Sequence, residues 1–155
     1  MSKNLRVFSI LAAVALAVAV LRYYMKGLLQ PLGVSDFAGS FVASVTIVTL
    51  VGLVIIFAKE GRAAEGAYWR AASWFAAFAL WCQALIIAGI LIAARTGTAT
   101  YYDEMNGKHM SLPPLTHAFQ HSIAAVVVAV VGMILGAPVY FLAKRGRHAS
   151  EPQSK

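Results

Sequence analysis

Four long apolar stretches constrain this chain more than any other feature of its sequence. Each exceeds about 18 residues, the length that marks a membrane-spanning helix, because a hydrocarbon core of about 30 Å needs roughly 20 helical residues. A helix satisfies its backbone hydrogen bonds internally, as a bilayer without water requires. We therefore predict an all-α integral membrane protein, a four-helix bundle with one domain over residues 1–155 and the lipid bilayer as a partner. The predicted helices cover residues 7–25, 37–58, 69–94 and 118–143.

The charge content agrees with that prediction. Only 12% of the 155 residues are charged and 60% are hydrophobic, whereas a soluble domain carries about 25% charged residues to solvate its surface. A disordered chain would lack the apolar stretches, and a nucleic-acid-binding protein would gather its basic residues in one footprint. The composition thus excludes a soluble globule, a disordered chain and a nucleic-acid partner. The net charge of +7 needs another explanation.

The distribution of lysine and arginine supplies it, because these residues concentrate in the cytoplasmic loops of membrane proteins. If the N-terminus is cytoplasmic, nine basic residues lie on the inner side (Lys3, Arg6, Lys59, Arg62, Arg70, Lys144, Arg145, Arg147 and Lys155) and four on the outer side (Arg22, Lys26, Arg95 and Lys108). We therefore predict that both termini are cytoplasmic, with a bacterial cytoplasmic (inner) membrane as the location. A long outer loop then covers residues 95–117, and residues 148–155 form a disordered polar tail.

Two alternatives stay open for the organisation of the helices. The basic start over residues 1–6 and the apolar residues 7–20 also resemble a signal peptide, whose removal would leave three helices in the same orientation. Segments 58–62 and 143–147 share four of five residues, which suggests a duplicated helical hairpin. The separations between matched positions vary along the chain, however, and tyrosine, basic residues and glycine follow membrane boundaries in unrelated helices as well.

The centres of the predicted helices contain no ionisable side chain other than the cysteine, which disfavours a proton pump or a voltage sensor. Gln83 is the most polar deep residue, and Ser40 and Ser44 lie four positions apart on one helix face. These three side chains either hydrogen-bond to neighbouring helices or form a polar lining for a small solute.

The fourth predicted helix contains a GxxxG motif at Gly132 and Gly136. Two glycines at this spacing lie on one face of a helix and allow another helix to approach closely. We assign both residues to helix packing.

The outer loop and the start of the fourth helix contain the candidate metal ligands. His117 and His121 lie four positions apart on one helix face, and two imidazoles at this spacing can bind one metal ion. Asp103, Glu104 and His109 in the loop could complete a transition-metal site. The residue after His117 is not Glu, so the HExxH motif of metalloproteases is absent. Partly solvated interfacial histidines are the simpler interpretation, and a haem held by two histidines on facing helices is disfavoured.

Three hypotheses for function follow. The favoured one is a non-catalytic subunit or binding module of a membrane complex, which associates with other membrane subunits or with itself and presents a polar outer loop. The alternative is an outer-face metal-binding or redox enzyme that uses His117 and His121. The third is a small-solute transporter that acts as an oligomer and is lined by Gln83, Ser40 and Ser44. The transition metal is the single cofactor that the sequence suggests.

Overall fold

The computed structural model describes residues 3–42, 44–105, 108–109 and 113–150, with the side chains of 3–4, 42, 103–105, 108–109 and 148–150 outside the description. Four spans are long and apolar enough to cross a membrane, so the prediction of a helical chain with four such spans is confirmed. The elements are α1 (Lys3–Leu29), η1 (Gln30–Leu32), α2 (Asp36–Val42), α3 (Val45–Arg62), α4 (Tyr68–Thr96), η2 (Tyr101–Asp103), β1 (Glu104–Met105), β2 (Lys108–His109) and α5 (Pro114–Ser150).

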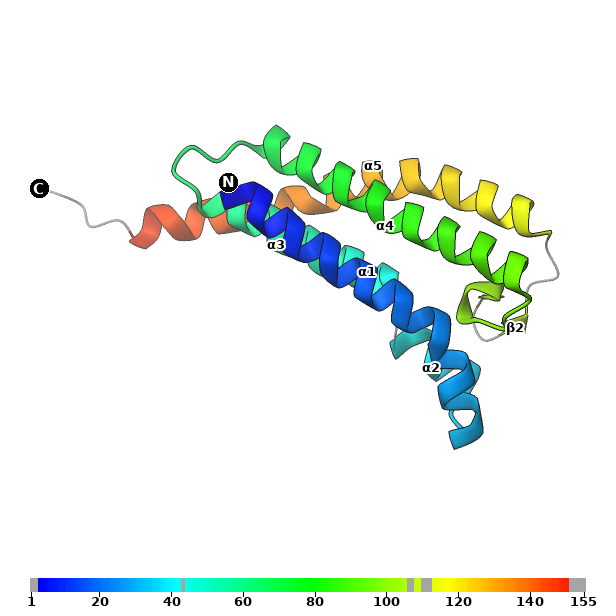
Figure 1. Ribbon diagram of the computed structural model, residues 1–155. Helices are drawn as coiled ribbons and strands as arrows, with labels where there is room; N and C mark the ends of the chain where they lie inside the picture. Colours follow the sequence, from blue (N-terminus) through cyan, green and yellow to red (C-terminus); the bar gives the residue numbers. More distant parts are fainter. Residues whose placement is uncertain (1–2, 43, 106–107, 110–112, 151–155) are drawn as a thin grey trace, which may run out of the picture.

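The long helices lie side by side and give the molecule two ends (Figure 1). We call one the loop end: α1 runs into η1 there, and α5 begins beside the short β1–β2 hairpin. We call the other the terminal end, where α1 begins and α5 finishes (Figure 1). α3 and α4 each contact the other three long helices.

The structure corrects three predicted boundaries. The second apolar stretch is divided into α2 and α3, because Ser44 is extended (φ −91°, ψ 113°) and its carbonyl accepts the first hydrogen bond of α3, from the N–H of Val48. Serine is a favoured residue at such a helix start. α5 begins at Pro114, inside the predicted outer loop, and continues to Ser150, so residues 148–150 of the predicted disordered tail are helical. Residues 151–155 lie outside the described part of the chain.

In the terminal half of the bundle, aromatic rings of two helices pack directly against glycines of a third helix. A Cβ at Gly132 would lie 2.0 Å from the ring of Phe75 on α4, and a Cβ at Gly136 would lie 2.3 Å from the ring of Phe57 on α3. The rings of Phe57 and Phe75 are themselves 6.0 Å apart and no more than 1% exposed. The GxxxG face of α5 therefore packs on phenylalanine side chains of two other helices.

A substitution of Gly132 tests this packing. We expect Gly132→Ala to lower the free energy of unfolding by about 1–3 kcal/mol, the usual cost of overpacking, because the new methyl group would displace the Phe75 ring. Thermal unfolding in detergent micelles measures the loss. Gly27→Ala is the matched control, since a Cβ at Gly27 would have nothing within 4 Å. Equal stability of the two variants would contradict the packing.

Candidate functional site

A cavity of about 440 Å³ opens at the loop end of the bundle. Its walls come from α1, α2, α3, α4, η2 and α5, so it forms where six elements meet. Polar, aromatic and aliphatic side chains line it. The lining residues are Arg22, Phe37, Ser40, Phe41, Ser44, Val45, Thr46, Ile86, Tyr102, His117, Gln120, His121 and Ala124.

The two histidines of the first turns of α5 lie side by side in this cavity. Their ring centroids are 5.1 Å apart, and His117 is only 9% exposed. Nδ1 of His121 is 3.0 Å from Oε1 of Gln83 on α4. An amide oxygen only accepts, so the contact is a hydrogen bond in the form of His121 that carries a hydrogen on Nδ1. Gln83 thus orients the His121 ring.

Arg22 supplies a fixed positive charge to the cavity. Its guanidinium donates to the carbonyl of Ser40 at 2.6 Å and to the carbonyl of Tyr101 at 2.8 Å. The same group lies over the ring of Tyr102, 5.3 Å from the centroid. These contacts connect α1 with α2 and η2, and a planar guanidinium with its fork of donors is suited to such bridging.

Two adjacent tyrosines of η2 pack against the helices, and one of them, Tyr102, lines the cavity. Tyr102 is 4% exposed and donates its hydroxyl hydrogen to the carbonyl of Ala19 at 2.9 Å. Its ring rests on Gly89, where a Cβ would lie 2.4 Å away, and the hydroxyl of Tyr101 would lie 2.0 Å from a Cβ at Gly39. Burial raises the pKa of Tyr102 to about 12, although the charge of Arg22 acts in the opposite direction. Tyr102 is therefore a neutral hydrogen-bond donor at physiological pH.

The cavity brings together residues that the sequence analysis treats separately. His117 and His121, the predicted metal ligands of α5, share it with Ser40 and Ser44, and Gln83 reaches it through its hydrogen bond to His121. Asp103, Glu104 and His109, the other predicted ligands, have described backbones only, and Glu104 pairs with His109 across the β1–β2 ladder. In the described part of the chain, no cluster of three or more His, Cys, Asp or Glu is placed to hold a metal ion.

Arg22 and Tyr102 are the site residues that sequence reasoning missed. It used Arg22 only as a basic residue of the outer side, and it gave Tyr102 no role in a site. An arginine inside an alanine- and valine-rich helix, directly before a tyrosine pair, offers a weak signal at best. Their roles depend on the approach of η2 to α1, which joins residues 79 positions apart.

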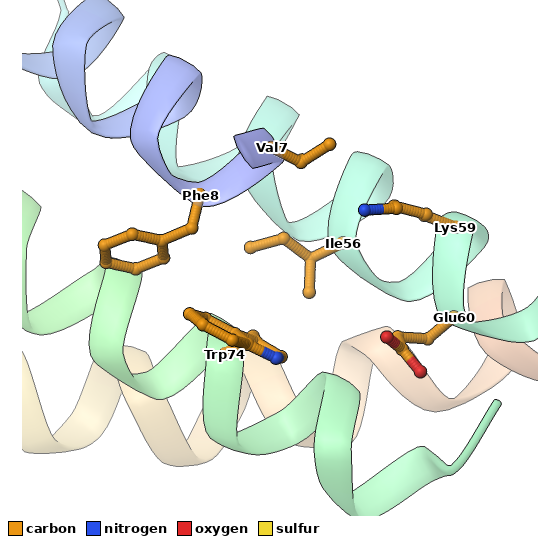
Figure 2. Close-up of a pocket in the computed structure, with 6 residues that line it drawn as sticks. All are labelled: Val7, Phe8, Ile56, Lys59, Glu60 and Trp74. Carbon is orange, nitrogen blue, oxygen red and sulfur yellow. The ribbon is translucent and has the colours of Figure 1, made fainter. Parts of the chain in front are cut away.

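The pocket at the terminal end shown in Figure 2 is too small to be a ligand site. Its volume is about 10 Å³, enough for about one water molecule. Glu60 lines it and is 3% exposed. The carboxylate accepts a hydrogen bond from Nε of Arg70 at 2.9 Å, as a buried charge requires. This pair of residues therefore has a structural role.

No protein-family model, curated protein or solved structure matches this chain, so its function is inferred from the site itself.

The Tyr102 phenol makes stability depend on pH in the alkaline range. The unfolded chain releases this proton near 10.0, whereas the folded chain holds it until about 12, so rising pH between these values favours unfolding. We expect the free energy of unfolding of the wild type to fall more steeply over this range than that of Tyr102→Phe. Unfolding in detergent at a series of pH values measures the difference. Parallel curves for the two proteins would contradict the assignment.

Proposed function

We propose that this protein is a non-catalytic binding module of a membrane complex, and that its loop-end cavity binds a small amphipathic ligand with an anionic head group. The observation that carries the proposal is the position of Arg22, held by two backbone carbonyls in a cavity that also contains two histidines. Among the described residues that line the cavity, none is Asp or Glu. The lining therefore offers hydrogen-bond donors, and no carboxylate among its described residues, to an anionic head group.

The size and the apolar part of the lining support an amphipathic ligand. The volume of about 440 Å³ falls within the roughly 300–1,000 Å³ of typical small-molecule sites. Phe37, Phe41 and Ile86 supply apolar surface beside the polar groups. Phe37 and Phe41 are 60% and 62% exposed, so they line a mouth that an apolar chain could enter.

The interior beyond the cavity favours binding over transport. The terminal half of the bundle is filled by the rings of Phe57, Phe75 and Phe78, which are no more than 1% exposed. A solute that enters at the loop end meets this packed aromatic layer. Gln83, Ser40 and Ser44 therefore fit the wall of a binding site better than the lining of a transport path.

Orientation and assembly complete the proposal. The excess of lysine and arginine at the terminal end favours a cytoplasmic location for both termini, in a bacterial inner membrane. The cavity then faces outward. The most apolar windows of the first and fourth spans are 17% and 22% buried, against 38% and 39% for the two middle spans. These two spans offer the most surface to lipid, to other membrane subunits or to a second copy.

Decanoate and decanol provide a matched pair of probes, because they share a chain length and differ in head-group charge. We expect the purified protein in detergent to bind decanoate at least about tenfold more tightly than decanol, since hydrogen bonds to charged groups contribute about 1.5–3 kcal/mol. Arg22→Gln should remove most of this preference. Isothermal titration calorimetry measures both affinities.

Two further variants keep this test decisive. Arg95→Gln is the matched control, because Arg95 is exposed at the end of α4 and is not among the residues that line the cavity. Ala124→Phe fills the cavity and leaves the contacts of Arg22 in place, so it should abolish decanoate binding in a folded protein. Equal affinity for decanol and decanoate, or full binding by Ala124→Phe, would refute the proposal.

A metal site at the two histidines is the second candidate, and the Gln83 contact favours it. A histidine that binds metal usually directs its other ring N–H to an acceptor that orients it, as Nδ1 of His121 does toward Gln83. Nε2 then points its lone pair away from Gln83. The fixed charge of Arg22 in the same cavity opposes a cation, which is why we rank this function second.

Zinc titration tests the second candidate. If the site binds metal, the wild type should take up Zn²⁺, His121→Ala should abolish the uptake, and Gln83→Leu should weaken it about 10- to 100-fold. His148→Ala is the control, since residue 148 lies near the opposite end of α5. Elemental analysis after dialysis measures bound metal. A wild type without zinc, or undiminished uptake by His121→Ala, would rule the site out.

A further inference from the structure

A second and larger groove lies at the terminal end, between α3 and α5. Its volume is about 710 Å³. Two guanidinium groups, those of Arg62 and Arg147, line it together with the apolar side chains of Val139 and Leu142. The groove combines cationic groups with an apolar wall, at the ends of two spans that are apolar enough to cross a membrane.

The local sequence explains why the groove stays unfilled. α3 and α5 touch at Gly61, where a Cβ would lie 2.4 Å from the carbonyl oxygen of Tyr140. Beside this contact the lining positions are small, with Ala58 on α3 and Ala143 on α5. Gly61 sets the contact between α3 and α5, and the small side chains of Ala58 and Ala143 next to it do not fill the space beside this contact. Leu142 at its wall is 67% exposed.

A backbone contact fixes the charged part of the groove. The guanidinium of Arg147 donates to the carbonyl of Ala63, just after the end of α3, at 2.7 Å. The carbonyl belongs to the residue next to Arg62, so the contact holds the α5 arginine against the segment that carries the second guanidinium. Among the described residues that line the groove, none is acidic.

We propose that this groove binds an anionic phospholipid, with the phosphate between Arg62 and Arg147 and an acyl chain along Val139 and Leu142. Arginine recognises phosphate through paired hydrogen bonds, and basic pockets between membrane helices bind anionic head groups. The apolar wall favours a lipid over inorganic phosphate, because an acyl chain would cover Val139 and Leu142 whereas a phosphate ion would leave these side chains exposed. This site lies at the opposite end from the loop-end cavity and stands independently of the proposed function.

Native mass spectrometry with added lipids tests the site. Purified protein in detergent is titrated with phosphatidylglycerol or with phosphatidylcholine of identical acyl chains. One high-affinity phosphatidylglycerol is expected per chain, bound at least about fivefold more tightly than phosphatidylcholine, because each arginine near the head group contributes a factor of about five. Arg62→Gln should reduce the preference by that factor, and Arg147→Lys should weaken binding while it keeps the charge.

The matched control is Arg145→Gln. Arg145 is exposed near the same end of α5 but is not among the residues that line the groove, so its loss should leave the tight site intact. Ala143→Leu fills the groove and should abolish tight binding without any change of charge. Three results would overturn the proposal: equal affinity for the two lipids, an equal effect of Arg145→Gln and Arg62→Gln, or complete displacement of phosphatidylglycerol by millimolar inorganic phosphate. Thermal unfolding of each variant confirms that it is folded.

Discussion

The rest of this structure depends on close packing between phenylalanine rings and glycines. A bilayer gives apolar side chains little reason to prefer each other over lipid, so helices associate through van der Waals packing and hydrogen bonds. Phe57 and Phe75 meet the GxxxG face of α5, and Phe78 meets Gly52 of α3, where a Cβ would lie 2.1 Å away. These contacts join α3, α4 and α5 around a core of phenylalanine rings, and the groove that Arg62 and Arg147 line lies outside this core.

The loop end combines the same kind of packing (Tyr102 on Gly89 and Tyr101 on Gly39) with hydrogen bonds around the cavity. The hydrogen bonds are directional: Arg22 donates to two carbonyls, Tyr102 donates to the carbonyl of Ala19, and His121 pairs with Gln83. Each of these hydrogen bonds joins two elements through a few atoms, and the cavity occupies space between the elements. Ser44, which is extended, separates α2 from α3. A core of packed aromatic rings and a polar cavity therefore coexist in one small bundle.

Much of the fold could be predicted from the sequence, because the length and apolarity of a span are local properties. The four spans and the helical start near His117 and His121 follow from local pattern alone. The division at Ser44 could not be predicted, since a serine within an apolar stretch fits either a continuous or an interrupted helix. The pairing of Glu60 with Arg70 across the turn between α3 and α4 was also missed. The histidine pair and the polar residues Gln83, Ser40 and Ser44 were predicted as two separate groups, and the sequence did not indicate that they meet at one cavity.

By itself, the sequence determined that this chain has four segments long and apolar enough to cross a membrane, that few charges enter the apolar stretches, and that two histidines share one face of a helix. Those properties follow from composition and from periods of a few residues. Only the tertiary structure decided that Arg22 faces these histidines across a cavity, and that Arg62 and Arg147 share a groove. The physical reason is distance along the chain. Arg22 meets the carbonyl of Tyr101 across 79 positions, and Arg147 meets that of Ala63 across 84, so helix packing alone brings these groups together.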